Sequence, residues 1–308
     1  MTSPVLEVEN FRVWYSGASG PVRAVDGVDF SLRPGEVLGL VGESGCGKST
    51  LGRGLMGLTP RGSAVGGSIR FDGRSLLDLS IRERDRVRGS GMGLIFQEPM
   101  TRLDPLMRIS AHFDEALQTH DRKLSKKQRE ERAIEALAAL GIPPTRYKNY
   151  PHEFSGGMRQ RIMIALALAL RPKFIIADEP TTALDVLVEA QILRILAQIR
   201  EQYAPAILLI THNLGIIAEA CDRVAVMYAG RIVEQGPVEA VFAAPAHPYT
   251  RELLRSTISL TTKVLHSIPG APPDLVAPPP GCRFHPRCPS AMQVCVSRAP
   301  RPRQVGPQ

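Results

Sequence analysis

The stretch GLVGESGCGKSTL at residues 39–51 decides the fold of this 308-residue chain. Its apolar start predicts a short buried strand over residues 37–41. Residues 42–49 then match the pattern G-x-x-x-x-G-K-[ST] without deviation. Glycines let such a loop curl so that its backbone N–H groups point at phosphate oxygens. The leucines that follow predict a helix whose positive N-terminus faces the same anion. Strand, loop and helix together indicate a site for nucleotide phosphates.

Every position of this loop is a candidate ligand of the nucleotide. We expect Lys48 to place a positive charge near the β- and γ-phosphates, and the Ser49 hydroxyl to ligate Mg²⁺. Cys46 is a small residue that the loop tolerates, and we assign it no redox role. The predicted nucleotide-binding residues of this segment are Gly42, Glu43, Ser44, Gly45, Cys46, Gly47, Lys48, Ser49 and Thr50.

A second acidic element follows an apolar strand predicted over residues 174–177. Asp178 at the strand's carboxyl end is placed to hold Mg²⁺ through water, and Glu179 to polarise the attacking water as a general base. A third apolar stretch, residues 206–211, leads directly into His212. Three strands with polar residues at their carboxyl ends predict an open, largely parallel α/β sheet with its ligand at one edge.

A long apolar helix is predicted to begin within EFSGGM, residues 153–158, and its first residues are glycines. Ser155 suits an N-cap, and Gly156 and Gly157 expose backbone N–H groups at the helix start. This would be a second helix end able to meet an anion. The plainer interpretation is a glycine-softened turn that leads into a core helix.

The net charge of +8 raises the question of a nucleic-acid partner. The densest charged segment, residues 120–132, mixes both signs and opens a helix, with Ser125 and Gln128 as a capping box and Gly141 as its stop. Aromatic residues are not interleaved with these charges, as base stacking would require. We therefore interpret the segment as a solvated helix face and expect no nucleic-acid partner.

Neither a membrane span nor a secretory signal is predicted. The most apolar stretch, residues 162–170, is closed by Arg171 and Pro172 and is too short to cross a bilayer. The first residues lack the charged-then-apolar pattern of a signal peptide, so we expect the chain to stay in the cytoplasm. Thiols remain reduced in that compartment, which argues against structural disulfides.

With these motifs in place, the chain resembles the ATP-binding subunits of ABC transporters. FSGGM is similar to the signature motif of that family, with Phe154 and Met158 where leucine and glutamine are commoner. The resemblance implies a head-to-tail dimer closed by ATP. In such a dimer, Ser155, Gly156 and Gly157 of one subunit contact the γ-phosphate held by the other.

The resemblance assigns roles to further residues. Gln97 in LIFQEP matches the glutamine that senses Mg²⁺ and relays movement to the membrane subunit. Asp185 in TTALD matches the loop aspartate that crosses the dimer interface, and His212 matches the histidine that touches the γ-phosphate. Tyr15 lies where the family places an aromatic ring under the adenine, with Trp14 as the alternative.

Residues 6 to 257 resemble most the branch that imports dipeptides and oligopeptides, and HPYT at residues 247–250 is its more specific mark. Related importers of nickel and glutathione share these features, so they remain the alternative. A soluble ABC ATPase outside transport is less favoured, because neither a coiled-coil arm nor a second cassette is present. The resemblance implies a second cassette, preferably a paralogue in a heterodimer, two transmembrane permease subunits and an extracytoplasmic substrate-binding protein. It places the chain at the cytoplasmic face of the cell membrane.

The expected fold is α/β, a P-loop nucleotide-binding domain of ABC type over residues 1–245. Residues 1–97 supply an antiparallel β-layer and the first half of the core, and residues 98–172 an inserted helical subdomain. Residues 173–245 complete the core and end in a hairpin, and residues 246–308 form a small cysteine-containing appendage.

That appendage holds Cys282, Cys288 and Cys295 in a stretch rich in proline and poor in large apolar side chains. Such a segment buries little surface, so we expect a metal to hold it together. The residue types alone allow zinc, with His285 as the fourth ligand. The resemblance implies instead a [4Fe–4S] cluster, for which three cysteines are present and the fourth ligand is open. We predict the cluster, with zinc as the alternative.

Overall fold

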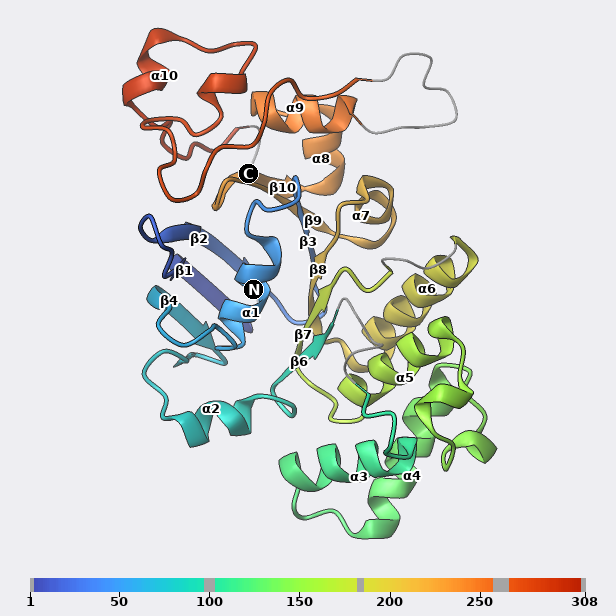
Figure 1. Ribbon diagram of the computed structural model, residues 1–308. Coiled ribbons are helices and arrows are strands. Elements are labelled where there is room, and N and C mark those ends of the chain that lie inside the picture. Colours follow the sequence, from blue (N-terminus) through green and yellow to red (C-terminus); the bar gives the residue numbers. More distant parts are fainter. Residues whose placement is uncertain (1–2, 97–102, 182–185, 257–265, 306–308) are drawn as a thin grey trace. The chain divides into compact units, whose positions relative to one another are not determined.

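The structure, a computed structural model, describes residues 3–96, 103–181, 186–256 and 266–305. Its contacts divide the chain into two compact units, whose elements are labelled in Figure 1. Unit 1 consists of Met1–Leu6, Ser31–Val37 and Arg70–Ile210, and unit 2 of Glu7–Phe30, Leu38–Ile69 and Thr211–Gln308. Among the described residues, no helix has both the length and the apolar character that a membrane crossing requires.

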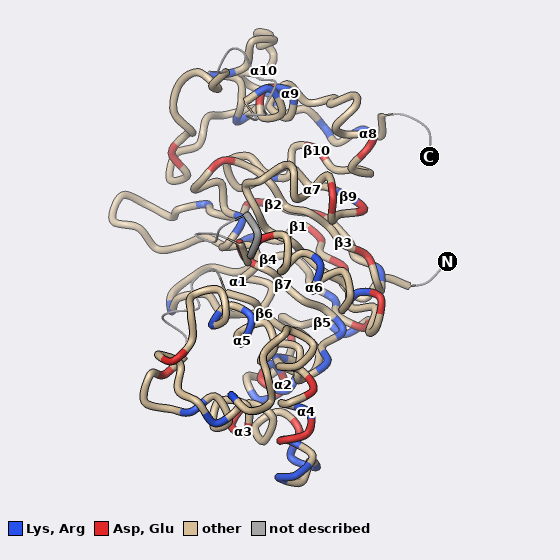
Figure 2. The backbone as a smooth tube through the Cα atoms, turned by 90° about the vertical axis from the view of Figure 1, so that its right-hand side faces the viewer, with Lys and Arg blue, Asp and Glu red and all other residues tan. Residues whose placement is uncertain are grey.

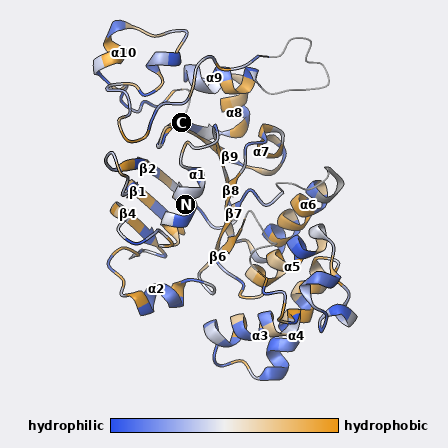
Figure 3. Cartoon of the chain, in the orientation of Figure 1, coloured by the Kyte–Doolittle hydropathy of each residue, from blue (hydrophilic) through white to orange (hydrophobic). Residues whose placement is uncertain are grey.

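The centre of unit 1 is a parallel sheet. It contains β6 (Met92–Ile95), β7 (Phe174–Asp178) and β8 (Ala206–Ile210), with β7 in the middle. Every residue of β7 and β8 is buried, and their apolar character is visible in Figure 3. Continuous apolar strands of this kind are typical of parallel sheets covered on both faces. The strands predicted near residues 174 and 206 are confirmed.

Helices complete unit 1: α2 (Ile81–Val87), α3 (Ile109–His120), α4 (Lys126–Ala139), α5 (Gly156–Leu168) and α6 (Val186–Tyr203). Of these, α3, α4 and α5 pack on one another. The capping box predicted for α4 is present. Its Ser125 hydroxyl accepts from the Gln128 N–H at 3.3 Å, and the Gln128 side chain accepts from the Ser125 N–H at 2.9 Å. Gly141 then follows the helix with φ 70°, a left-handed value that suits glycine.

The charged face of α4 pairs its charges locally. Arg129 contacts Asp114 at 2.6 Å, and Arg132 contacts Asp121 at 3.6 Å. Figure 2 shows both signs of charge along this helix. Arg129 is 12% and Arg132 25% exposed in these pairs, while most other residues of the segment are exposed. This arrangement agrees with the interpretation of residues 120–132 as a solvated helix face.

Unit 2 contains strands of two sheets. One sheet has the order β2 (Val22–Leu32), β1 (Leu6–Tyr15) and β4 (Ala64–Phe71), and the end of β4 pairs with β5 (Arg74–Ser75) inside unit 1. In the other sheet, β3 (Val37–Val41) pairs in parallel with β9 (Arg223–Tyr228), and β9 pairs antiparallel with β10 (Arg231–Pro237). The predicted hairpin is confirmed. Its turn, Ala229 and Gly230, has φ values of 47° and 82°, as a tight type I′ turn requires.

The helices of unit 2 are α1 (Lys48–Leu55), α7 (Leu214–Ala220), α8 (Val238–Ala243), α9 (Pro248–Arg255) and α10 (Gln293–Ser297), with the short 3₁₀ helix η4 (His285–Arg287). The C-terminal segment is anchored by Phe284, which is 1% exposed. Its ring lies 5.2 Å from that of Tyr228 and 5.3 Å from that of Tyr249. Side chains therefore hold this segment, where the sequence led us to expect a metal. The predicted domain boundary at residue 245 remains a proposal.

Candidate functional site

The phosphate loop, residues 42–49, packs directly against backbone atoms of two strands. Gly42 has φ 153° and Gly47 has φ 109°, values that favour glycine. A Cβ atom on Gly42 would lie 2.1 Å from the carbonyl oxygen of Met227, and one on Gly47 would lie 2.0 Å from that of Ala24. Any larger residue is therefore excluded at both positions. The strands β2 and β9 fix the curl of the loop.

Lys48 lies near the end of the phosphate loop and is the first residue of α1. Its side chain is buried, and Nζ donates to the carbonyl oxygens of Gly42 at 2.8 Å and Glu43 at 3.1 Å. Cys46 is buried beside it, and burial raises the pKa of its thiol above the ordinary value. A buried neutral thiol is unreactive, which fits the absence of a redox role. The exposed residues Ser44 and Gly45 form the tip of the loop.

The aromatic residues at the end of β1 have different partners. The Tyr15 hydroxyl donates to Thr50 Oγ1 at 3.1 Å, so this ring lies beside the start of α1. The Trp14 indole donates to Asp26 Oδ1 at 3.1 Å, and the Arg23 guanidinium lies over its ring. Of the two candidates for the adenine, Tyr15 is the one in contact with the phosphate-loop helix. Its role stays a prediction.

The C-terminal segment contacts the phosphate loop through Glu43. The Tyr249 hydroxyl accepts from the Glu43 backbone N–H at 3.0 Å. Arg287 binds the Glu43 carboxylate with both terminal nitrogens, at 2.7 and 2.9 Å. The side chain of Arg287 is only 5% exposed, and its hydrogen bond with Glu43 holds the pKa of the guanidinium above its usual value. A fork-shaped pair of this kind is among the stronger interactions of a protein surface.

This support was not predicted from the sequence. From the sequence, HPYT is only a mark of a family branch, and Arg287 is not singled out. Arg287 also donates to the carbonyl oxygens of Pro269 at 2.8 Å and Ile268 at 3.2 Å. The only available signal was HPYT itself, which contains Tyr249.

In unit 1, the acidic pair lies at the carboxyl end of β7. Asp178 is its last residue and is 4% exposed. Glu179 follows with φ 47°, a left-handed conformation that is uncommon outside glycine, and its N–H donates to Ile210 at 2.9 Å. Such backbone conformations cluster at functional sites. The chain thus turns sharply between the predicted magnesium ligand and the predicted general base.

Gln160 supports the segment after this pair. It is 2% exposed on α5, and its side chain donates to the carbonyl oxygen of Pro180 at 2.7 Å. Pro180 directly follows Glu179. The helix that begins at the signature turn is therefore tied to the residue after the predicted base. The sequence held no clear signal for this contact.

His212 lies between β8 and α7 and is exposed. The next residue, Asn213, is the N-cap of α7, and its side chain accepts from the Gly215 N–H at 2.9 Å. The Asn213 N–H in turn donates to the Thr211 hydroxyl at 3.0 Å. Asparagine is a preferred N-cap, so it has a local structural role here.

The signature turn, residues 155–157, begins α5. Ser155 is the N-cap, as predicted, and its hydroxyl accepts from the Met158 N–H at 3.3 Å. Ser155 and Gly156 are both exposed. A Cβ atom on Gly156 would meet nothing within 4 Å. The helix start is thus presented at the surface of unit 1.

Arg146 contacts both residues that depart from the common signature motif, Phe154 and Met158. Its guanidinium lies over the ring of Phe154, with Cζ 4.3 Å from the ring centre. It also contacts the Met158 sulfur at 3.7 Å and the Glu153 carbonyl oxygen at 2.6 Å. An aromatic face and a polarisable sulfur are both suitable partners for this cation.

The predicted site residues fall in both units. Unit 2 contains Tyr15, the phosphate loop with Thr50, and His212, and it brings Tyr15 and Thr50 into contact. Unit 1 contains Ser155, Gly156, Gly157, Asp178 and Glu179. Gln97 and Asp185 lie outside the described residues.

The three tail cysteines do not form a metal site in this structure. The Cys282 N–H donates to Cys295 O at 2.9 Å, so the backbones of these two residues lie side by side. However, within the described ranges, no three His, Cys, Asp or Glu residues are grouped as ligands for a metal ion. Instead, Cys282 and Cys288 pack against the apolar cluster around Phe284. The predicted iron–sulfur cluster and its zinc alternative with His285 are therefore not supported here, and two of the three thiols pack as small apolar groups.

Comparison with known proteins agrees with this geometry. The profile of the family "ABC transporter" matches residues 25–182, and that of "Oligopeptide/dipeptide transporter, C-terminal region" matches residues 233–295. The chain is 47% identical over 300 residues to the oligopeptide transport ATP-binding protein OppD of Salmonella typhimurium, covering 96% of this chain and 89% of that protein. It is 48% identical over 297 residues to the dipeptide transport ATP-binding protein DppD of Bacillus subtilis, covering 94% and 88%.

Solved structures agree as well. The dimeric ATP-binding cassette MJ0796 with bound ADP and Pi is 26% identical, with a TM-score of 0.68 over 76% of this chain and 98% of that one. The cassette cbiO1 of Clostridium perfringens is 29% identical, with a TM-score of 0.67 over 78% and 91%. The expected fold class, an ABC-type α/β cassette, is confirmed. By its phosphate loop, its acidic strand end and these matches, the chain belongs to the ABC transporter family.

Proposed function

We propose that this chain is the ATP-hydrolysing subunit that energises the import of dipeptides or oligopeptides by an ABC transporter. The observation that carries the proposal is the direct contact of Tyr249 and Arg287 with Glu43. Both contacting residues lie in the segment that matches the oligopeptide and dipeptide transporter region, and Glu43 lies in the phosphate loop. The names of two similar proteins, the oligopeptide and dipeptide transport ATP-binding proteins, support the same substrate class.

The residues present fit a magnesium nucleotide by their chemistry. The phosphate loop keeps its curl because a Cβ atom at Gly42 or Gly47 would collide with Met227 of β9 or Ala24 of β2, and Lys48 adds a positive charge. Ser49, Asp178 and Gln97 would hold Mg²⁺ through oxygen atoms, the ligands that this ion prefers. When bound, Mg²⁺ neutralises charge that develops on the phosphates.

Hydrolysis itself requires a base and charge stabilisation from this chain. Glu179 would accept a proton from the attacking water, and His212 and Lys48 would stabilise negative charge on the γ-phosphate. The signature turn and Asp185 would serve the nucleotide of a partner cassette. The exposure of Ser155 and Gly156 supports this division of labour, because both residues lie at the surface of their own unit.

We infer the following partners. A second cassette, preferably a paralogue, would complete each site, and the dimeric form of MJ0796 supports pairing of cassettes. Two transmembrane permease subunits and an extracytoplasmic binding protein would supply the pathway and the specificity. The chain would then lie at the cytoplasmic face of the membrane, bound through the permeases.

The test is peptide uptake by the reconstituted complex in proteoliposomes. Glu179→Gln should bind ATP normally, lower hydrolysis by about 10²–10⁴-fold and stop uptake, because the general base is lost. Competition with dipeptides, oligopeptides, glutathione and nickel identifies the transported class. Full hydrolysis in the variant would remove Glu179 from its role. Uptake of nickel or glutathione alone would replace the proposed substrate.

The iron–sulfur cluster is a separate hypothesis. Cys282, Cys288 and Cys295 lie within one short stretch, which supports it. Protein purified without oxygen should then contain iron and acid-labile sulfide, and Cys288→Ser should lose both. Stoichiometric zinc would favour a site with His285. A metal-free protein with a protease-resistant tail would reject both versions.

A further inference from the structure

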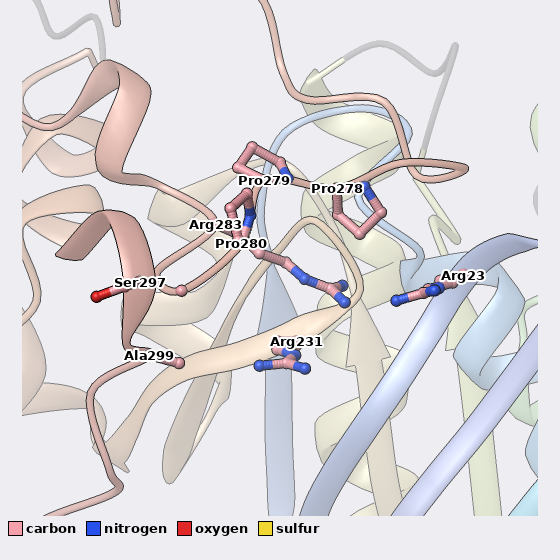
Figure 4. A pocket seen from close by; sticks show the side chains of 9 residues that line it. Arg23, Arg231, Pro278, Pro279, Pro280, Arg283, Ser297 and Ala299 are labelled. Carbon is pink, nitrogen blue, oxygen red and sulfur yellow. The ribbon is translucent and has the colours of Figure 1, made fainter.

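A cavity of about 300 Å³ lies in unit 2, apart from the phosphate loop. Its lining includes Arg23, Arg231 and Arg283, the proline run Pro278–Pro280, and Ser297. Figure 4 shows the three guanidinium groups on one side of the cavity, with the prolines opposite. None of these residues belongs to the nucleotide site.

One carboxylate pairs with two of these three cations. Asp26 is 7% exposed and pairs with Arg283 and, at 3.3 Å, with Arg231. Burial acts to raise the pKa of Asp26, but the charges of Arg283 and Arg231 outweigh it and hold that pKa below its ordinary value. Arg23 has no carboxylate partner among the described residues and lies over the Trp14 ring, 5.2 Å from its centre. The cavity therefore has an excess of positive charge.

Some donors in this cluster are unpaired. The Nε atoms of Arg23 and Arg231 are buried and have no hydrogen-bond partner in the described part of the chain. Buried polar groups are nearly always hydrogen-bonded, so each such donor calls for an explanation. Burial and then the charge of Arg231 lower the pKa of Arg283, which shows that these like charges repel one another. A bound anion beside the guanidinium groups would relieve this repulsion.

The wall of the cavity is fixed before any ligand binds. Proline has a restricted φ and no N–H group, so Pro278–Pro280 form a stiff wall without donors of their own. Gly281 follows with φ 66°, and a Cβ atom there would lie 2.4 Å from the carbonyl oxygen of Cys295. The loop is thus packed tightly on the α10 segment. A preformed site loses little entropy on binding.

We propose that this cavity is a binding site for a small phosphate-bearing anion. The planar guanidinium group presents its donors in a fork that matches phosphate oxygens, and three such groups line this cavity. The Ser297 hydroxyl adds a further possible donor. The same chemistry would suit a soluble phosphate compound or the headgroup of an anionic phospholipid.

Binding of inorganic phosphate and pyrophosphate to the full-length protein tests the proposal. Titration calorimetry is done in a Lys48→Ala background, which removes phosphate binding at the nucleotide site, with chloride at matched ionic strength as reference. Arg23→Gln and Arg231→Gln should each weaken binding roughly 10- to 100-fold, since each loses a charge-assisted contact. Arg251→Gln, at an exposed position of α9, is the matched control and should bind like its parent.

Sedimentation with phosphatidylcholine vesicles, with and without phosphatidate, distinguishes the two sources. Vesicle binding that requires phosphatidate and both arginines, without affinity for free phosphate, assigns the site to a lipid headgroup. Circular dichroism checks that each variant is folded. The double variant Arg23→Lys, Arg231→Lys should keep both charges but lose the fork-shaped donors, so its affinity for phosphate should be intermediate. The proposal is overturned if neither phosphate nor vesicles bind, or if folded glutamine variants bind as tightly as the control.

Discussion

The phosphate loop and the signature turn both place glycines at the start of a helix, yet their surroundings differ. Backbone atoms of β2 and β9 press on Gly42 and Gly47, and Tyr249 and Arg287 hold Glu43. At the signature turn, Gly156 has free space around it and is exposed. A helix end surrounded by its own chain is ready to bind an anion by itself. A helix end at the surface can complete a site on another molecule.

The largest expected effect is the loss of ATP binding when a glycine of the phosphate loop is replaced by alanine. In Gly47→Ala, the new methyl would lie 2.0 Å from Ala24 O at φ 109°, so the loop must distort. We expect ATP affinity to fall by more than about 100-fold, since displacements of about 1 Å at a site have such effects. Fluorescent nucleotide titration of the isolated subunit measures this loss.

Gly156→Ala is the matched variant. Its methyl meets no atom of the chain within 4 Å, so stability should change by less than about 0.5 kcal/mol and ATP binding should stay normal. Hydrolysis by the assembled complex should fall, because the methyl would lie where a partner's nucleotide must approach. Equal losses of ATP binding in both variants would contradict the comparison.

A smaller effect is expected when the support of Glu43 is removed. Arg287→Ala breaks the two bonds at 2.7 and 2.9 Å, which should lower the free energy of unfolding by about 1.5–3 kcal/mol. The KM for ATP should rise while kcat changes little, because the loop is loosened and the base Glu179 is untouched. Arg251→Ala, on the exposed face of α9, is the control for loss of an arginine.

Steady-state hydrolysis and urea unfolding of both variants provide the measurements. In a double-mutant cycle with Glu43→Gln, the two changes should not be additive, since they remove the same pair. Additive effects would mean that Arg287 acts on stability through Pro269 and Ile268 rather than through the loop.

The smallest effect is expected at the N-cap of the signature helix. Ser155→Ala removes the acceptor of the Met158 N–H and should cost about 1 kcal/mol of unfolding free energy. Ser155→Asp keeps an acceptor and should restore that stability, but its charge would repel a partner's phosphate. Chemical denaturation of the isolated chain and hydrolysis by the complex separate these two roles. If the aspartate variant restored hydrolysis as well, the turn would not face a phosphate.

Local patterns predicted much of the fold correctly because the forces behind them act over a few residues. The strand of residues 37–41 agrees with β3, the capping box at Ser125 is present, and Ser155 is an N-cap. A glycine pattern, an apolar run and a serine before a helix are each read from one short segment. The tail was predicted less well, because a count of prolines and apolar residues does not reveal where Phe284 packs.

The sequence by itself determined that this chain has a nucleotide phosphate loop, an acidic strand end and a glycine-opened signature helix, since each motif needs only its own residues. Tertiary structure alone decided what surrounds them. Tyr249 and Arg287 reach Glu43 across 206 and 244 positions, and Arg283 reaches Asp26 across 257. Which residues form such contacts depends on how strands and loops pack in space, and no periodicity or spacing in the sequence indicates it. A cysteine can be a metal ligand or a small apolar group in a core. The spacing of the three tail cysteines therefore suggested a metal but could not exclude apolar packing.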